Sequence, residues 1–260
     1  LYDTDYEGSG GESAGVWIST SLMDGGNHNN FGNTPPYYNA IEREMLGICE
    51  PIRITSDGSY SLGPLDKTNT VYRIDTDHED EYYLLECRSG KGWDAYIGGK
   101  GMLVYHIDRS DRSSGYSENY GRVLKAYERW EAANEVNCRP DHQCADLLEA
   151  DGRNDIFSHD IPADISGVFF PQYGATAIIP DSTPGFRFWS GATCGVTVSE
   201  IRWEDGVIKF NISGLSEDTV PPGISNVTIE TFTDAAILHF ESERLFEGNA
   251  VIEWGRAGDK

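Results

Sequence analysis

Alternation of apolar and polar side chains dominates the sequence and predicts a β-rich fold. In a half-buried strand successive side chains face opposite sides, so a period of two indicates strands. Glu204-Asp205-Gly206 lies between two such runs and predicts a tight hairpin. The runs are PIRIT (51–55), SYSLG (59–63), TVYRID (70–75), EYYLLEC (81–87), GMLVYHID (101–108), ADLLEAD (145–151), VTVSEIRW (196–203) and VIKFNIS (207–213).

Two segments have helical patterns instead. YYNAIEREMLG (37–47) follows two prolines, repeats apolar residues every fourth position and stops at a glycine, as helices do. GRVLKAYERWEAAN (121–134) has Val123, Tyr127 and Trp130 at helical spacing, which predicts a short surface helix. Residues 1–34 are rich in Gly, Asn, Ser and Asp and predict a long loop. The fold class expected is therefore α+β, rich in strands.

A domain boundary is expected near residue 216. The segment SEDTVPPG (216–223) is a polar linker that ends in two prolines. Residues 224–260 hold three alternating runs that resemble the opening strands of a fibronectin type III-like β-sandwich, here truncated because such a fold needs about 100 residues. Residues 1–215 form the other expected domain.

The charge balance narrows the classes of partner. Twenty Lys and Arg against 43 Asp and Glu give a net charge of −23. Such a chain neutralises neither a nucleic-acid backbone nor an anionic membrane surface, so neither is expected as a partner. No run approaches the roughly 18 apolar residues that membrane insertion requires. Acidity favours cations, above all calcium, for which Asp108 and Asp111 are candidate ligands.

Cysteine and histidine positions allow two readings of one loop. Of five cysteines, Cys138 and Cys144 stand close together in a polar stretch and are candidates for a local disulfide. His142 lies between them, which permits a metal site instead.

The string LMDGG (22–26) permits a functional reading of the N-terminal loop. A methionine in a tight turn can form the apolar floor beneath a zinc ion, as in proteases of the metzincin type. Four further strings accompany it in order along the chain: LYDTD at the start, ECRSGKGWDAYIGGKGMLVYHID (86–108), HQCADLLEADGRND (142–155) and SGATCGVTVSEIRWEDGVIKFNI (190–212). Together these blocks resemble the secreted bacterial zinc metallopeptidases typified by immune inhibitor A, over about residues 1–213.

The resemblance implies the C-terminal part of a metzincin-like catalytic domain that hydrolyses peptide bonds in proteins and peptides. In that family a His-Glu-x-x-His stretch holds the zinc and the general base, and it commonly runs directly into Tyr-Asp-Thr. No such motif occurs among the six histidines here. The resemblance thus implies a secreted or cell-surface parent, with the zinc ligands and the N-terminal half of the domain upstream of Leu1.

This chain alone is then expected to be inactive, with no catalytic residue retained. The resemblance leaves it the active-site floor, formed by Leu22, Met23, Asp24, Gly25 and Gly26. Glu12, in the same loop, is a further candidate zinc ligand, because a carboxylate can bind zinc.

Other readings stay open. The acidity, the aromatic residues Trp17, Trp93 and Trp189 and the appended sandwich also suit a non-catalytic, calcium-braced adhesin or glycan-binding module. His106 and Asp108 share a strand face, either as a catalytic pair or as structural hydrogen-bonding groups. Glu149 and Asp151 share a face of the run 145–151 and permit a glycosidase-like carboxylate pair.

Overall fold

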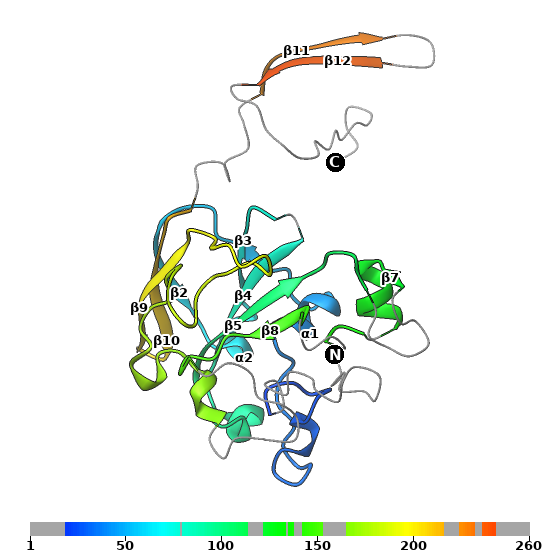
Figure 1. Ribbon diagram of the computed structural model, residues 1–260. Helices are drawn as coiled ribbons and strands as arrows, with labels where there is room; N and C mark the ends of the chain where they lie inside the picture. Colours follow the sequence, from blue (N-terminus) through cyan, green and yellow to red (C-terminus); the bar gives the residue numbers. More distant parts are fainter. Residues whose placement is uncertain are drawn as a thin grey trace. The chain divides into compact units, whose positions relative to one another are not determined.

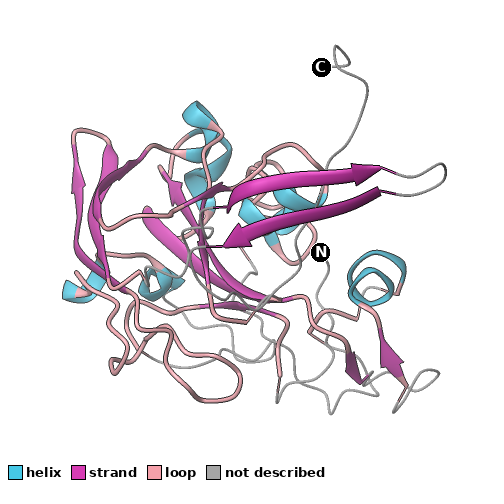
Figure 2. Cartoon of the chain, turned by 90° about the horizontal axis from the view of Figure 1, so that it is seen from above, coloured by secondary structure: helices cyan, strands magenta, loops and turns pink. Residues whose placement is uncertain are grey.

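The computed structural model describes residues 19–78, 80–113, 122–133, 135–137, 142–152, 165–215, 224–231 and 236–242. The chain divides into two compact units, Leu1–Leu215 and Ser216–Lys260, and each is considered by itself. The fold is α+β and rich in strands, as the alternating pattern predicts (Figures 1 and 2). Within the described residues, no helix is both long and apolar enough to cross a membrane.

A five-stranded sheet organises the first unit, in the order β1-β3-β4-β5-β8. Its centre is the antiparallel pair β4 and β5, each eight residues long, and Figure 1 shows β5 between β4 and β8. Only β1 and β3 run parallel to each other. The strands are β1 Ile52–Arg53, β3 Tyr72–Asp75, β4 Glu81–Arg88, β5 Gly101–Asp108 and β8 Ala145–Leu147.

A second, three-stranded antiparallel sheet has the order β2-β10-β9. It consists of β2 Gly58–Leu62, β9 Thr197–Glu204 and β10 Val207–Ser213. The hairpin predicted between β9 and β10 is confirmed. Its two turn residues, Asp205 and Gly206, both have positive φ (54° and 82°), the conformation of the turn that matches the strand twist. A small ribbon pairs β6 Arg112–Ser113 with β7 Val123–Leu124.

Two hydrophobic cores lie on opposite faces of the central pair, because alternate side chains of β4 and β5 point to opposite sides. Leu84 and Tyr105 belong to the core that includes Ile41 of the first helix. Tyr83 and Val104 belong to the core shared with the three-stranded sheet, through residues such as Phe210. Every residue of both strands is buried, which makes them the rigid centre of the unit.

The helices are short. The helix predicted over 37–47 is α1, Ala40–Met45, and it begins later because Asn39 caps it. The Asn39 side chain accepts the Glu42 N–H, and the Glu42 carboxylate accepts the Asn39 N–H, a reciprocal capping box. The other helical elements are α2 Leu65–Thr68, η2 Gly26–His28, η3 Gly92–Tyr96, η4 Glu128–Ala132, η5 Ile165–Val168 and η6 Gln172–Gly174.

Two predicted elements differ from the structure. Within 121–134 the expected helix forms only over 126–132, which includes the π-helical turn η4, because the backbone of Val123 and Leu124 before it pairs with β6 as β7. The predicted strand 145–151 ends at Leu147; the Leu148 N–H still donates to the Val104 carbonyl of β5 (2.9 Å), and Ala150 and Asp151 then enter a turn. In the first case a long-range pairing overrides the local pattern.

The second unit contains one described hairpin. Strands β11 Ile224–Thr231 and β12 Ala236–Ser242 pair antiparallel, with a register irregularity between Ser225 and Thr228. The linker predicted at 216–223 and the third run, 249–255, lie outside the described residues.

A buried ionic network joins the end of β4 to three other elements. The Arg88 guanidinium makes five hydrogen bonds: to both carboxylate oxygens of Asp94 (2.5 and 2.8 Å), to Glu86 (3.0 Å) and to the carbonyls of Thr20 (3.3 Å) and Tyr37 (3.2 Å). All five guanidinium N–H donors are thereby used. The side chains of Arg88, Glu86 and Asp94 are at most 1% exposed.

The two carboxylates of this network extend it. Glu86 also accepts the Ala40 N–H at the start of α1 (2.5 Å) and the Tyr105 hydroxyl (2.9 Å). Asp94, in η3, also accepts the Tyr37 N–H (3.2 Å). The network therefore fastens the loop before α1 and the turn after β4 to the central sheet.

We predict that Arg88→Met lowers the free energy of unfolding by about 3–5 kcal/mol, because it leaves Glu86 and Asp94 buried without their cation. The matched control is Arg53→Met, which breaks an exposed pair with Asp75 and is expected to cost about 0–1 kcal/mol. Urea unfolding measures both. Equal losses in the two variants would contradict a structural role for the network.

Candidate functional site

Polar side chains gather where β4 begins and β5 ends. The antiparallel register places Glu81 opposite Asp108 and Tyr83 opposite His106. His106 and Asp108 are two residues apart and share a face of β5. The strands are apolar in the middle and polar at this end, so a cluster of titratable groups forms at the edge of the core.

His106 pairs with Glu81 rather than with Asp108. Its Nε2 lies 3.0 Å from Glu81 Oε2, which also accepts the backbone N–H of Trp189 (3.1 Å). Burial by itself raises the pKa of the Glu81 carboxyl. The hydrogen bonds from His106 and Trp189 outweigh that effect and lower the pKa below its ordinary value of 4.5.

Asp108 has a partner of its own, His142, whose Nε2 lies 2.6 Å from Asp108 Oδ2. The same oxygen accepts Arg112 Nη2 (3.1 Å), and Oδ1 accepts the Ser110 N–H (2.7 Å). Burial raises the pKa of the Asp108 carboxyl, but these donors and the Arg112 charge prevail and hold the pKa well below its usual range. Asp108 is thus a buried carboxylate that stays ionised.

Trp189 joins the two carboxylate–histidine pairs. Its ring stacks on His142 at a centroid separation of 4.2 Å and on His106 at 5.5 Å. His106 in turn stacks on Tyr83 at 4.7 Å. Four rings from four separate segments therefore form a continuous stack, and each histidine ring has its orientation fixed by both a carboxylate and a neighbouring ring.

Two hollows meet at Trp189. One, of about 390 Å³, extends from His106 toward Glu149 and Phe188. The other, of about 370 Å³, is lined by His78, Asp80, Ser110, Arg112 and His142. Both volumes fall within the range of small-molecule sites. Their linings combine aromatic rings with acidic, imidazole and guanidinium groups, which suits hydrogen-bonding ligands.

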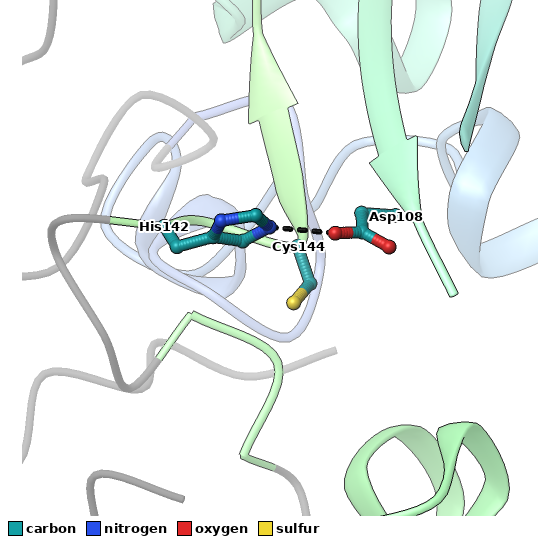
Figure 3. Close-up of side chains that lie close together, drawn as sticks. All are labelled: Asp108, His142 and Cys144. Carbon is teal, nitrogen blue, oxygen red and sulfur yellow. Dashed lines mark hydrogen bonds and ion pairs between the residues drawn. The ribbon is translucent and has the colours of Figure 1, made fainter. Parts of the chain in front are cut away.

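A possible metal-binding group lies beside the second hollow. Atoms of Asp108, His142 and Cys144 all approach within 4.8 Å of one another, and Figure 3 shows the three side chains converging. Within the described part of the chain this is the one such group of three or more residues. Its side chains supply an oxygen, a nitrogen and a sulfur, so the group can hold a metal ion.

The turn at Leu22–Gly26 lies in a different place, next to α1. Glu42 Oε1 accepts the Ser21 hydroxyl (2.6 Å) and the Met23 N–H (3.4 Å), and Ser21 O accepts the Gly26 N–H (2.9 Å). A Cβ at Gly26 would come within 2.4 Å of Ser21 O, so the turn requires glycine there. The Met23 side chain is 50% exposed.

The remaining predicted residues are dispersed. Asp111 pairs with Lys125 (2.5 Å), whereas Asp108 pairs with Arg112 and His142, so the calcium site stays a prediction. Trp93 lies half exposed in η3, and Glu149 and Asp151 follow β8 rather than lying on it. Glu12, Trp17 and Cys138 lie outside the described residues, so the Cys138–Cys144 disulfide and the Glu12 zinc ligand stay predictions.

Glu81 and Trp189 are the two site residues that sequence reasoning did not bring together with the histidines. Glu81 lies 25 residues before His106 in the sequence. Trp189 lies 108 residues after Glu81. One local signal existed: Glu81 is a charged residue directly before the apolar run 82–85 of β4. Comparison of the chain with protein-family models, with curated proteins and with solved structures found no match.

We predict that the Glu81 contacts make stability depend on pH in the acidic range. The folded-state pKa lies below the ordinary value of 4.5, so the contribution is complete above that value. As the pH falls below it, the unfolded chain takes up the proton first and stability is lost. Urea unfolding at about pH 6 and about pH 3.5 measures this loss, which should be smaller in Glu81→Gln.

Glu50→Gln, at an exposed carboxylate, is the control and should keep the acid-dependent loss of the parent chain. At neutral pH, Glu81→Gln should lower the free energy of unfolding by about 1.5–3 kcal/mol, the usual value of hydrogen bonds to a charged group. An unchanged pH dependence in Glu81→Gln would contradict the assignment.

Proposed function

We propose that this chain is part of a secreted zinc-dependent endopeptidase, namely the part of the catalytic domain that follows the zinc-binding helix. The proposal rests on five ordered sequence blocks that resemble the immune inhibitor A type of metallopeptidase. Its substrates would be proteins and peptides.

The geometry of the turn at Leu22–Gly26 is the observation that carries the proposal. A floor beneath a metal needs a fixed backbone and an apolar side chain offered to the surface. Glu42 accepts the Met23 N–H of this turn and the hydroxyl of the adjacent Ser21, while half of the Met23 side chain remains exposed. Arg88 also donates to the carbonyl of Thr20, two residues before the turn. A methionine displayed in this way suits a packing role under metal-bound histidines.

The zinc itself would be held by residues that this chain does not contain. No His-Glu-x-x-His motif occurs in the sequence, and the turn offers Met23 as a packing group rather than a ligand. When bound, zinc would polarise the scissile carbonyl and activate water. The part played by this chain would be to exclude water beneath the metal through Met23 and to keep the turn in place through Glu42.

Asp108, His142 and Cys144 do not take the place of the missing ligands. They lie at the Glu81 end of β4, whereas the turn is fastened near the Arg88 end. At about 3.3 Å per residue, an eight-residue strand separates its ends by on the order of 20 Å. The two places are therefore distinct.

The decisive experiment is to read the coding sequence upstream of Leu1 in its source gene and to produce the chain with that extension. We expect a His-Glu-x-x-His motif, zinc bound by the extended protein, and hydrolysis of a protein substrate that a zinc chelator abolishes. The chain without the extension should be inactive. An extension that lacks such ligands would overturn the proposal and favour a binding module on the same scaffold.

We predict that Met23→Leu in the extended protein weakens zinc retention modestly without abolishing hydrolysis, because leucine preserves volume but not shape. The matched control is Met45→Leu, which makes the same change at the last residue of α1, a partly buried side chain that packs against the core. Zinc content after dialysis against a weak chelator measures the effect. Equal retention in both variants would count against the floor assignment.

A further inference from the structure

Backbone pairing brings the three residues of the metal-binding group together. Asp108 is the last residue of β5, and its N–H donates to the Cys144 carbonyl (2.8 Å). One residue further on, Ala145 begins β8 and pairs with Ile107. Asp108 and Cys144 are thus adjacent across two paired strands, and His142 precedes Cys144 by two residues.

The identity of the three groups selects a class of metal. Calcium and magnesium prefer oxygen ligands throughout, whereas a thiolate and an imidazole suit zinc and similar transition metals. We propose that Asp108, His142 and Cys144 form a structural zinc site at the edge of the central sheet. This site is independent of the zinc that the proposed peptidase function would require.

The spacing of the group suits a small tetrahedral ion. Zinc bonds of about 2.0–2.3 Å keep ligand atoms roughly 3.3–3.8 Å apart in a tetrahedron. The three atoms here lie within 4.8 Å of one another, with His142 and Asp108 closer, at 2.6 Å. Shifts on the order of 1 Å would admit the ion. The carboxylate and a thiolate would together balance its two positive charges.

Arg112 is the group that competes with a cation. Its guanidinium pairs with the same Asp108 oxygen that faces His142, at 3.1 Å. The Arg112 side chain is 38% exposed and can turn outward into solvent, whereas Asp108 is fully buried and cannot follow it. Metal binding would therefore exchange the arginine for the ion at that oxygen.

The hollow beside His142 provides the route of entry. His142 and Arg112 both line the cavity of about 370 Å³, so an ion arriving there would meet the imidazole first. The same hollow leaves room for water at a fourth coordination position. Cys144 has no exposed surface, which closes it to an external substrate and rules against a nucleophilic Cys-His-Asp arrangement.

Cobalt titration of the reduced, metal-stripped chain tests the site, because a thiolate bound to Co²⁺ absorbs in the near ultraviolet and tetrahedral Co²⁺ absorbs in the visible. We expect one equivalent of Co²⁺ to produce both bands, Zn²⁺ to abolish them and Ca²⁺ to leave them unchanged. Cys144→Ser should remove the sulfur band, and His142→Gln should weaken binding at least tenfold. Cys194→Ser, at a buried cysteine of the other core, is the control and should keep both bands.

Arg112→Gln removes the competing cation and should tighten Co²⁺ binding by about tenfold. Misfolding of a variant could explain a loss of binding but not this gain. Absence of the sulfur band in the parent chain, or its persistence in Cys144→Ser, would overturn the proposal. So would a Cys138–Cys144 disulfide that withstands mild reduction. None of these outcomes depends on the upstream sequence, so the site and the peptidase proposal fail or stand separately.

Discussion

Complete hydrogen bonding of the buried Arg88 guanidinium is the constraint on which this unit depends. Removing one cation and two carboxylates from water costs several kcal/mol for each ion, and only full pairing offsets that cost. Here all five N–H donors of the guanidinium have acceptors. Two of the acceptors are backbone carbonyls in the loop before α1, so the loop cannot leave the sheet without stranding the charge. The loop before α1, which has few apolar residues, is thereby held in a single position against the sheet.

The same two central strands carry polar groups at both ends, and their middle is apolar. Near Arg88 the guanidinium is paired with the carboxylates of Glu86 and Asp94 inside the protein, and none of the three lines either of the two hollows. Near Glu81 and Asp108 the carboxylates are paired with histidines, and two hollows reach them. The first arrangement stores its interactions in the fold, whereas the second leaves imidazole and aromatic faces open to a ligand. The charged groups at both ends of the strands are buried, and the two ends differ in whether a ligand can reach them from a hollow.

Local pattern predicted the parts of this fold whose partners lie nearby in sequence. The run 81–87 became β4, the run 101–108 became β5, and the turn at Asp205-Gly206 formed between its predicted strands. In 121–134 the helical spacing held only for the second half, because the backbone at Val123 pairs with Ser113 in β6 and the helix starts at Ala126. Pairing between segments has no signature in the spacing of either one.

The candidate site follows the same rule. His142 and Cys144 could be singled out because they are neighbours in the sequence, and Asp108 was singled out separately as an acidic residue. What joined them was the β5–β8 register, which the separate runs do not contain. The stack of Trp189 on both histidines likewise depends on a loop more than 40 residues beyond His142.

Two kinds of cross-link could involve Cys144 at this edge of the sheet, a disulfide or a metal site. A disulfide to Cys138 would close a short loop and would use neither Asp108 nor His142. A zinc ion would use both and would bind that loop directly to β5. Asp108 is fully buried at this edge and faces the imidazole at 2.6 Å, an arrangement that a disulfide would not require. Asp108 is already paired with His142, Arg112 and the Ser110 N–H, so its burial is compensated, and of the two chemistries only the metal would also join it to Cys144. On that physical ground the metal is the better account of why Asp, His and Cys meet at this edge.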